Sequence, residues 1–388
     1  MTTEAFGVYL HWPFCAAKCP YCDFNSHVRN RAIDQKSYAL GFDREMASLR
    51  QRTGPRQVNS IFLGGGTPSL MEPATVKTIL ASIHRYWSVA ENAEITMEAN
   101  PSSVEAHRFY GYREAGINRL SLGVQALNDN ALRVLGRLHN VDQAYQAIEL
   151  ARQIFPRLSF DLIYARPSQT LKDWGTELNQ AIDLAADHLS LYQLTIEEGT
   201  AFDHLYKVGK LTVPEPELAA DLYQLTQEIT ASRGLPAYEI SNHAKPGAQS
   251  RHNLIYWRYG EYIGIGPGAH GRFLEKDKAG LRTVTINHKK PEIWLAQVLD
   301  KGNGIFEEET LTLKQQAEEM LLMGLRLTEG LDIIAFESFA GQNISQETIK
   351  KLQEDCLLQT LGNGRIAATE QGRILLNYII TKLASSIR

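Results

Sequence analysis

Residues 6–22 read FGVYLHWPFCAAKCPYC. The first six of them, FGVYLH, have the apolar and aromatic character of a buried β-strand. Three cysteines follow with the spacing C-x3-C-x2-C, and the fourth cysteine of the chain, Cys356, stands alone far downstream. We expect Cys356 to be a small buried apolar residue. Disulfides are rare in the cytosol, so the tight cluster predicts metal or redox chemistry.

The spacing of the three cysteines favours an iron–sulfur cluster. A structural zinc site normally takes four protein ligands, and no second C-x2-C or H-x3-H pair is present, although a catalytic zinc with three thiolates stays open. A [4Fe–4S] cluster held by Cys15, Cys19 and Cys22 leaves one iron without a protein ligand. S-adenosylmethionine can occupy that iron through its amino and carboxylate groups. We therefore expect these cysteines to be the metal ligands.

Downstream of the cysteines, short apolar runs alternate with amphipathic ones. After the strand at 6–11, the pattern predicts strands at 60–63, 94–98, 119–124, 158–164 and 188–194, and helices at 34–49, 73–87, 104–115, 141–154 and 171–184. Such alternation is typical of a parallel sheet with right-handed crossovers. Six β/α units are too few for a closed eight-stranded barrel. We therefore predict an α/β fold built on an open, partial (β/α)6 barrel.

Polar and glycine residues follow the predicted strands. Gly64–Pro68 follow the second strand, Glu98–Pro101 follow the third, Gln125 ends the fourth and Asp161 lies in the fifth. In barrels of this kind the chemistry takes place at the C-terminal ends of the strands. We expect these residues to meet the cysteines there.

Several motifs resemble the radical S-adenosylmethionine superfamily and, within it, the oxygen-independent coproporphyrinogen III oxidase group. They are YLHWPFC at 9–15, GGGTPS at 64–69, EANP at 98–101, LSLGVQ at 120–125, LGR at 135–137 and FDLIY at 160–164. The resemblance covers nearly the whole chain and implies a [4Fe–4S] cluster with S-adenosylmethionine. It further implies cofactor contacts from Tyr9, Tyr21, Gly65, Gly66, Thr67, Glu98, Gln125, Arg137 and Asp161.

One loop departs from the pattern of this group. Ala165-Arg166-Pro167-Ser168-Gln169-Thr170 stands where many relatives have a G-L-P-G-Q turn, so Ala165 and Ser168 replace two glycines. Glycine tolerates backbone conformations that other residues avoid. The sequence therefore does not predict the backbone conformation of this loop.

Two branches of the group differ at positions that this sequence shows. The decarboxylating oxidases usually carry a fourth cysteine two residues after the third, where this chain has Phe24. The haem chaperone branch, HemW, carries an H-N-x-x-Y-W motif, which is present here as His252–Trp257. The resemblance to HemW implies a protein that binds haem, with His252 as a contact, and delivers it to respiratory-chain apoproteins. A neutral imidazole is a suitable axial ligand for haem iron.

Two alternatives stay open beside the haem chaperone. One is an oxygen-independent coproporphyrinogen III oxidase, and the other is a radical enzyme for another substrate in which His252 is only structural. Catalytic residues are not assigned. The net charge of −4 gives no reason to expect nucleic acid as a partner.

The remaining expectations concern organisation and location. We predict a core domain at 1–240, a linking segment with the HNxxYW motif at 241–290, and a mainly helical, winged-helix-like C-terminal domain of HemN type at 291–388. The N-terminus lacks the basic and apolar regions of a signal peptide, so we expect a cytoplasmic protein. A homodimer and peripheral membrane contact are both compatible with the sequence.

Overall fold

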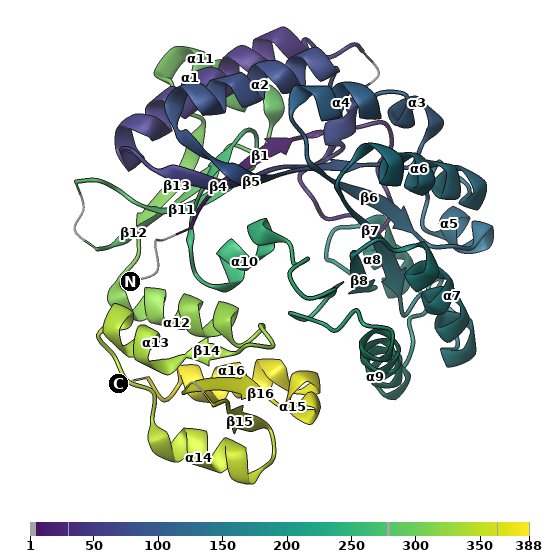
Figure 1. The fold of residues 1–388 in the computed structure, drawn as a ribbon, viewed down its shortest axis with the longest axis vertical. Coiled ribbons are helices and arrows are strands. Elements are labelled where there is room, and N and C mark those ends of the chain that lie inside the picture. Colours follow the sequence, from purple (N-terminus) through teal and green to yellow (C-terminus); the bar gives the residue numbers. More distant parts are fainter. Residues whose placement is uncertain (1–4, 30, 278–279, 363, 388) are drawn as a thin grey trace.

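The computed structural model describes residues 5–387 except 30, 278–279 and 363. Its largest feature is a curved eleven-stranded sheet in the order β13-β12-β11-β10-β1-β4-β5-β6-β7-β8-β9 (Figure 1). Six neighbouring strands run parallel: β1 (Phe6–Trp12), β4 (Gln57–Gly65), β5 (Ser88–Ala99), β6 (Arg119–Gln125), β7 (Arg157–Tyr164) and β8 (His188–Gln193). They confirm the predicted open barrel of six β/α units.

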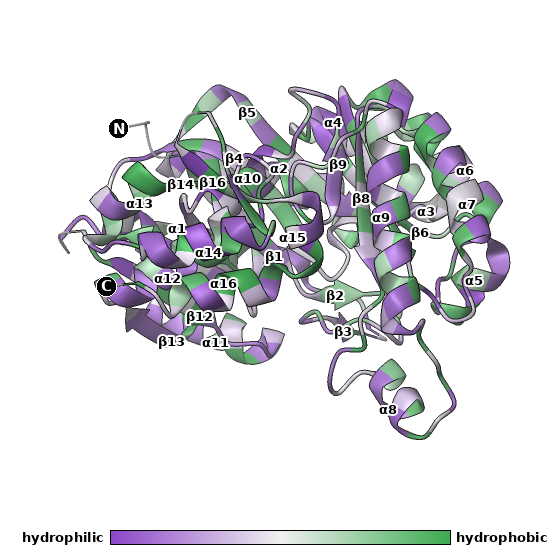
Figure 2. Ribbon diagram, turned by 90° about the horizontal axis from the view of Figure 1, so that it is seen from below, coloured by the Kyte–Doolittle hydropathy of each residue, from purple (hydrophilic) through white to green (hydrophobic). Residues whose placement is uncertain are grey.

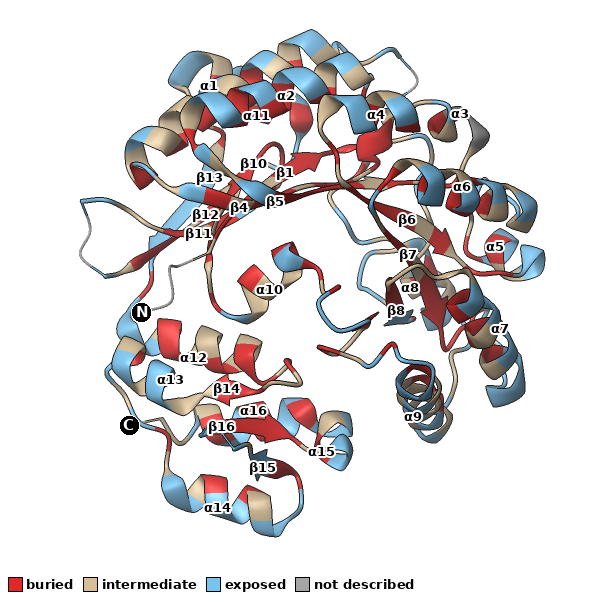
Figure 3. Cartoon of the chain, viewed as in Figure 1, coloured by how far each residue is buried: buried red, intermediate tan, exposed pale blue. Residues whose placement is uncertain are grey.

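The connecting helices lie along the convex side of the sheet (Figure 1). They are α1 (Gln35–Thr53), α2 (Pro73–Tyr86), α3 (Ser103–Ala106), α4 (Phe109–Ala115), α5 (Asp129–Val134), α6 (Val141–Ile154) and α7 (Leu171–Leu184). Capping boxes fix the starts of α6 and α7, where Asn140 and Thr170 are the capping residues. Polar residues are frequent on the outer faces of these helices (Figure 2), and the strands behind them are mostly buried (Figure 3). The apolar core therefore lies between the helices and the sheet.

The single helix predicted at 104–115 is two short helices, α3 and α4. Glu105, in α3, accepts a hydrogen bond from the backbone N–H of Asn100 at 2.8 Å and is 5% exposed. Arg108, between the two helices, donates to the carbonyl of Leu70 at 3.0 Å. These contacts tie the first turn to the loops at the ends of β4 and β5, so the segment bends where an uninterrupted helix was expected.

Residues 241–290, expected to form a linking segment, contribute strands to the main sheet. After α8 (Ala201–Lys207) and α9 (Pro216–Ser232), the chain forms β9 (Asn242–Ala244), α10 (Arg251–Trp257), β10 (Glu261–Ile265), β11 (His270–Leu274) and β12 (Arg282–Asn287). β10 pairs in parallel with β1, and β11 and β12 continue the sheet as antiparallel strands. Helix α10 lies inside the concave face of the sheet (Figure 1). The sheet therefore continues past the expected boundary at residue 240.

The glycines in this segment explain why its strands escaped prediction. A Cβ atom on Gly264 would lie 2.0 Å from the carbonyl oxygen of His270. Only glycine allows β10 and β11 to approach so closely, and glycine also removes the side-chain alternation from which strands are recognised.

The C-terminal region has its own apolar core, formed around residues such as Leu321, Phe336 and Ile379. Its helices are α12 (Leu313–Gly324), α13 (Ile333–Ala340), α14 (Gln346–Glu354), α15 (Glu370–Ile374) and α16 (Leu376–Ala384). A small antiparallel sheet is formed by β14 (Leu331–Asp332), β16 (Arg365–Ala368) and β15 (Leu358–Thr360), in that order. This arrangement agrees with the predicted mainly helical domain.

The helix and strand just after residue 290 belong with the barrel. Trp294 and Val298 of α11 (Pro291–Lys301) are packed in the main apolar core, and β13 (Ile305–Thr310) is an edge strand of the main sheet. We therefore propose that the C-terminal domain begins near residue 311. Cys356 is exposed rather than buried as we expected, because it lies in the turn after α14 with a φ of 58°. No helix in the described part of the chain has the length and apolar character needed to cross a membrane.

Candidate metal and cofactor site

The three clustered cysteines lie on the loop that follows β1. The loop contains two short paired strands, β2 (Phe14–Cys15) and β3 (His27–Val28), and the N–H of Cys22 donates to the carbonyl of Cys19 at 3.1 Å. All three thiols are free and half-buried. Burial raises the pKa of Cys15 and of Cys22. Cationic or hydrogen-bond-donating neighbours would therefore favour the thiolate form that a metal requires.

A glycine loop at the end of β4 packs directly against the cysteine loop. The N–H of Gly66 donates to the carbonyl of Trp12 at 2.7 Å, and the N–H of Thr67 donates to that of Phe14 at 2.8 Å. A Cβ atom on Gly66 would lie 2.7 Å from the Phe14 oxygen. Thr67 leads into η1 (Pro68–Leu70). The absence of side chains at the glycines is thus what lets the two loops touch.

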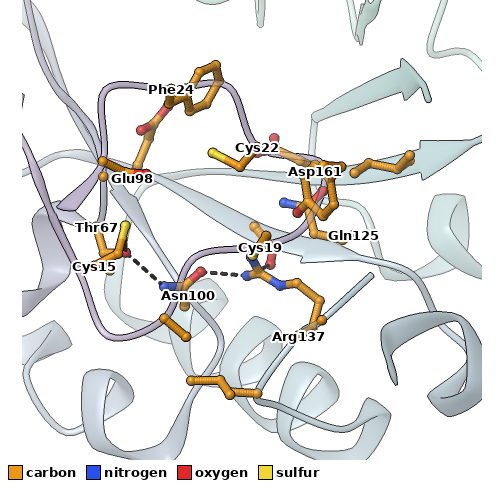
Figure 4. Close-up of a pocket in the computed structure, with 18 of the residues that line it drawn as sticks. Cys15, Cys19, Cys22, Phe24, Thr67, Glu98, Asn100, Gln125, Arg137 and Asp161 are labelled. Atoms are coloured by element: carbon orange, nitrogen blue, oxygen red, sulfur yellow. Dashed lines mark hydrogen bonds between the residues drawn. The ribbon is translucent and has the colours of Figure 1, made fainter. Parts of the chain in front are cut away.

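A chain of hydrogen bonds connects two of the cysteines through the floor of the site (Figure 4). The hydroxyl of Thr67 donates to Sγ of Cys15 at 3.3 Å, and Nδ2 of Asn100 donates to Oγ1 of Thr67 at 3.3 Å. Arg137 donates from Nη2 to Oδ1 of Asn100 at 2.5 Å and from Nη1 to Sγ of Cys19 at 3.3 Å. Donors to cysteine sulfur stabilise thiolate ligands and tune the potential of an iron–sulfur cluster.

Asn100 is a site residue that the sequence did not single out. It belongs to the EANP motif, but an asparagine after a strand is common in turns and gives no sign of its partners. Only its position near Glu98, at the end of β5, could have indicated that Asn100 lies in the site.

Two carboxylates, Glu98 and Asp161, face the site from β5 and β7. Glu98 accepts a hydrogen bond from the N–H of Gly65 at 3.1 Å. Burial and the neighbouring Asp161 raise the pKa of Glu98 to about 8, and burial raises the pKa of Asp161 to about 6 against the effect of the Ser190 hydroxyl. Arg119 and Arg137 offset the rise in the pKa of Asp161 only in part, and two buried carboxylates in one cavity suit a ligand that brings positive charge or hydroxyl groups.

Gln125 ends β6 in a left-handed backbone conformation, with a φ of 71°. Non-glycine residues rarely adopt this region, and when they do the strain is often found at functional sites. The turn directs the chain toward α5 and leaves the Gln125 side chain in the site (Figure 4).

The loop at 165–170, which departs from the family pattern, has left-handed backbone angles at the two positions where many relatives have glycine. Ala165 and Ser168 have φ angles of 54° and 60°. The loop is held in place by Arg166, whose guanidinium forms a buried ion pair with Glu177. This pair supplies the constraint that keeps the two residues in a conformation they would otherwise avoid.

These groups surround one cavity of about 420 Å³. Of the residues predicted from the sequence, the cavity is lined by Cys15, Cys19, Cys22, Tyr21, Gly65, Gly66, Thr67, Glu98, Gln125, Arg137 and Asp161. Tyr9 and His252 do not line it. The expected convergence at the C-terminal ends of the strands is therefore present, without these two residues.

His252 lies away from the cavity, against the early part of the strands. It is 1% exposed, with Nδ1 bonded to the hydroxyl of Ser60 at 2.7 Å and Nε2 bonded to the hydroxyl of Tyr256 at 2.5 Å. Burial lowers its pKa to about 3. Because both ring nitrogens have partners, His252 has no nitrogen open to a haem iron in this conformation.

The residues of the cavity fit a [4Fe–4S] cluster and S-adenosylmethionine. Three thiols are available, and two of them already accept hydrogen bonds from Thr67 and Arg137. Gly65 and Gly66 line the cavity with backbone alone, and a Cβ atom on Gly65 would lie 2.5 Å from the His11 ring, so only glycine lets the backbone pack against His11 at this point. Glu98 and Asp161 match the cationic and hydroxyl groups of the cofactor.

Comparisons with known proteins agree with this site. The Radical SAM superfamily model matches residues 9–181, and the HemN C-terminal domain model matches residues 311–375. The solved structure of coproporphyrinogen III oxidase (HemN) from Escherichia coli has a TM-score of 0.81 and 22% identity, covering 98% of this chain and 90% of that one. Fold and site together define a radical S-adenosylmethionine protein with a HemN-type C-terminal domain.

Relatives that align over nearly the whole chain identify the family within this class of proteins. The heme chaperone HemW of Haemophilus influenzae is 36% identical over 384 residues, which cover 96% of each chain. HemW of Escherichia coli is 35% identical over 96% of this chain and 97% of its own. A mitochondrial radical S-adenosyl methionine domain-containing protein 1 of Bos taurus is 36% identical over 100% of this chain and 89% of its own. The chain belongs to the HemW family, as the sequence motifs predicted.

Proposed function

We propose that this chain is a haem chaperone that carries a [4Fe–4S] cluster with S-adenosylmethionine and passes haem to apoproteins of the respiratory chain. The observation that carries the proposal is the similarity, over nearly the whole chain, to proteins named heme chaperone HemW. The cavity supports it by placing three free thiols beside the backbone of Gly65 and Gly66 and two carboxylates.

The chain's residues divide into two groups around the cofactors. Cys15, Cys19 and Cys22 would hold the cluster, and Thr67 and Arg137 donate hydrogen bonds to the Sγ atoms of Cys15 and Cys19. The backbone at 65–67 would receive the methionyl amino group, and the side chains that would contact the remainder of S-adenosylmethionine are those of Tyr21, Glu98, Gln125 and Asp161, which line the same cavity. When both are bound, a reduced cluster can supply the electron that cleaves S-adenosylmethionine to a radical.

The competing function is the oxidation of coproporphyrinogen III. The likeness to HemN concerns the fold, whereas Phe24 occupies the position of the oxidases' usual fourth cysteine. Phe24 is 59% exposed and lines the cavity, so the difference lies within the site itself. This favours the chaperone.

Contact between haem and His252 stays a prediction. It requires a movement of α10 that frees the imidazole from Ser60 or Tyr256, because both occupy ring nitrogens in the described conformation. Tyr9, which stacks on the His252 ring, would act on the cofactor site only through His11. The respiratory apoproteins as recipients, a homodimer, peripheral membrane contact and a cytoplasmic location also stay predictions.

One sample can test the proposal. The full chain is reconstituted anaerobically with iron and sulfide, titrated with haem, and then incubated with coproporphyrinogen III, S-adenosylmethionine and a reductant. A chaperone gives a saturable Soret band and no protoporphyrinogen. Formation of protoporphyrinogen with consumption of S-adenosylmethionine would instead establish the oxidase.

A further inference from the structure

The mouth of the cofactor cavity carries large apolar side chains that face open space. Phe24, on the cysteine loop, is 59% exposed, and Leu138, between α5 and α6, is 75% exposed. Tyr192 from β8 lines the same cavity and is 41% exposed. These side chains come from three separate parts of the chain, and they gather at a cavity whose lining also contains charged groups such as Glu98, Arg137 and Asp161.

Neither Phe24 nor Leu138 belongs to an apolar cluster of the described residues. Both stand outside the buried clusters and the apolar residues packed on them, and Phe24 makes no ring contact with a described aromatic residue. Leu138 is flanked by Arg137, which binds Cys19, and by His139, which is 6% exposed and bonded to the carbonyl of Val124. Leu138 is thus held outward by two anchored neighbours. Exposed apolar surface beside a cavity is a mark of ligand binding.

A flat apolar ring system suits this surface. An aromatic side chain and an aliphatic one that line the same cavity from two different loops can contact a macrocycle over its face or edge. Lys18 is exposed on the same loop as Phe24, and among the described residues no ion pair engages it, so it supplies a cation for a carboxylate at the rim of such a ligand. The motif residue His252, in contrast, is closed off on the other side of Tyr9.

We propose that haem docks at the mouth of the cofactor cavity, with its macrocycle against Phe24 and Leu138, and that these two residues determine haem affinity. The inference rests on the proposed chaperone function and places its cargo above the cluster rather than at His252. Phe24 then has a physical reason to stand where the oxidases usually carry a cysteine: it gives the ring of the cargo an aromatic surface.

The test compares truncations that are matched in chemistry and exposure. Phe24→Ala is paired with Phe306→Ala, since Phe306 on β13 is 60% exposed, and Leu138→Ala is paired with Ile334→Ala, since Ile334 on α13 is 74% exposed. Each full-length variant is reconstituted with its cluster and titrated with haem, following the Soret band. We expect Phe24→Ala and Leu138→Ala each to raise the Kd for haem about tenfold, and the two controls to stay within about twofold of the wild type. Phe24→Tyr, which keeps the ring, should retain the affinity.

Iron content and S-adenosylmethionine affinity are measured on the same samples to separate the outcomes. Iron content should be unchanged in Phe24→Ala and Leu138→Ala, and the affinity for S-adenosylmethionine should change less than the affinity for haem, so that a weaker Soret titration reports the loss of the docking surface. If these two variants bind haem as tightly as their controls, the inference is overturned while the chaperone function stands. If His252→Ala loses haem at a temperature at which circular dichroism shows the variant to be folded and its iron content is that of the wild type, the motif holds the haem and the inference is again overturned. If the wild type binds no haem at all, the proposed function itself fails.

Discussion

The imidazole ring of His252 lies stacked beside the ring of Tyr9, with 6.4 Å between the ring centroids and 27° between the planes. The hydroxyl of Tyr9 is bonded to Nδ1 of His11 at 2.9 Å, and Nε2 of His11 is bonded to the carbonyl of Asn25 at 2.9 Å. Asn25 follows the last cluster cysteine by three residues. The HNLIYW motif is therefore connected to the cysteine loop through two side chains of β1, and a change at His252 can reach the cluster without any contact to haem.

His252→Ala should lower the free energy of unfolding by about 2–4 kcal/mol, because it leaves a buried void and removes the partners of the Ser60 and Tyr256 hydroxyls. His84→Ala, in an exposed residue of α2, should change it by less than about 0.5 kcal/mol. Urea denaturation of both variants measures the difference. Equal stability of the two would show that the buried hydrogen bonds of His252 contribute little.

Cys19→Ser should abolish the iron–sulfur absorbance of anaerobically reconstituted protein, since one of three thiolates is lost and Arg137 then faces a weaker acceptor. Cys356→Ser removes an exposed thiol on the C-terminal domain and should leave iron and sulfide content unchanged. Chemical analysis of both elements is the measurement. A cluster that survives in Cys19→Ser, or disappears in Cys356→Ser, would contradict the ligand set.

Gly65→Ala should be far more damaging than the same change at another left-handed glycine. Gly65 has a φ of 112°, and an added Cβ would lie 2.5 Å from the His11 ring, whereas Gly199 has a φ of 78° with nothing within 4 Å. We expect a loss of about 1 kcal/mol for Gly199→Ala from backbone strain alone, and about 3 kcal/mol or more for Gly65→Ala. Thermal unfolding of the cluster-free proteins tests this ranking, and similar losses would show that the His11 ring moves aside easily.

Glu98→Gln should stabilise the cluster-free protein and weaken its cofactor binding. The pKa of Glu98 rises from 4.5 to about 8 on folding, so the folded state keeps a proton that the unfolded state releases. The stability of the wild type should therefore fall as the pH rises from about 4.5 to about 8, and the glutamine should recover about 1–2 kcal/mol at the alkaline end. Urea titrations across this range measure the slope. Calorimetric titration with S-adenosylmethionine should show affinity about tenfold lower, because the carboxylate is lost.

Much of the site could be predicted because its residues follow a rule of position. Glu98, Gln125 and Asp161 lie at or near the carboxyl ends of parallel strands, and those ends meet on one side of the sheet. The same rule does not predict the position of His252. Its Nδ1 is bonded to the hydroxyl of Ser60, which lies 192 residues earlier in the chain. Tyr9 lies midway along β1 and is too deep to line the cavity.

Other features depend on contacts that a pattern of residue types does not record. The bond between Asn100 and Arg137 joins two loops that are 37 residues apart in the chain, and neither residue type indicates its partner. The strands from β10 onward were hidden by glycines that are required by close packing, as at Gly264. The left-handed angles of Ala165 and Ser168 could be expected from the replaced glycines, but the Arg166–Glu177 pair that maintains them could not.

Glu45→Ala should be the most destabilising of these changes, although Glu45 is remote from every predicted motif. Its carboxylate is 1% exposed and accepts hydrogen bonds from the backbone of Gly266 at 2.8 Å and of Gly304 at 2.9 Å, and from the side chains of Asn287 at 3.0 Å and Trp294 at 3.1 Å. Its loss leaves four buried donors unpaired between α1, β10, β12 and α11, so we expect a loss of about 3–5 kcal/mol.

Glu292→Ala is the matched control for this change, because Glu292 forms an exposed ion pair with Arg29 and should contribute less than about 1 kcal/mol. Burial raises the pKa of Glu45 to about 7 against its four donors, so the wild type should also lose stability as the pH rises from about 4.5 to about 7. Glu45→Ala should lose the contribution of Glu45 to that slope and keep the contribution of Glu98, so its stability should fall less steeply than that of the wild type over this range. Denaturant titrations at several pH values measure both effects, and an equal loss in the two alanine variants would mean that the four donors find other acceptors.

The loss of Glu45 should also reach the cysteine loop, because Gly266, which donates to Glu45, lies against the carbonyl of His11. The yield of reconstituted cluster should therefore fall in Glu45→Ala but not in Glu292→Ala.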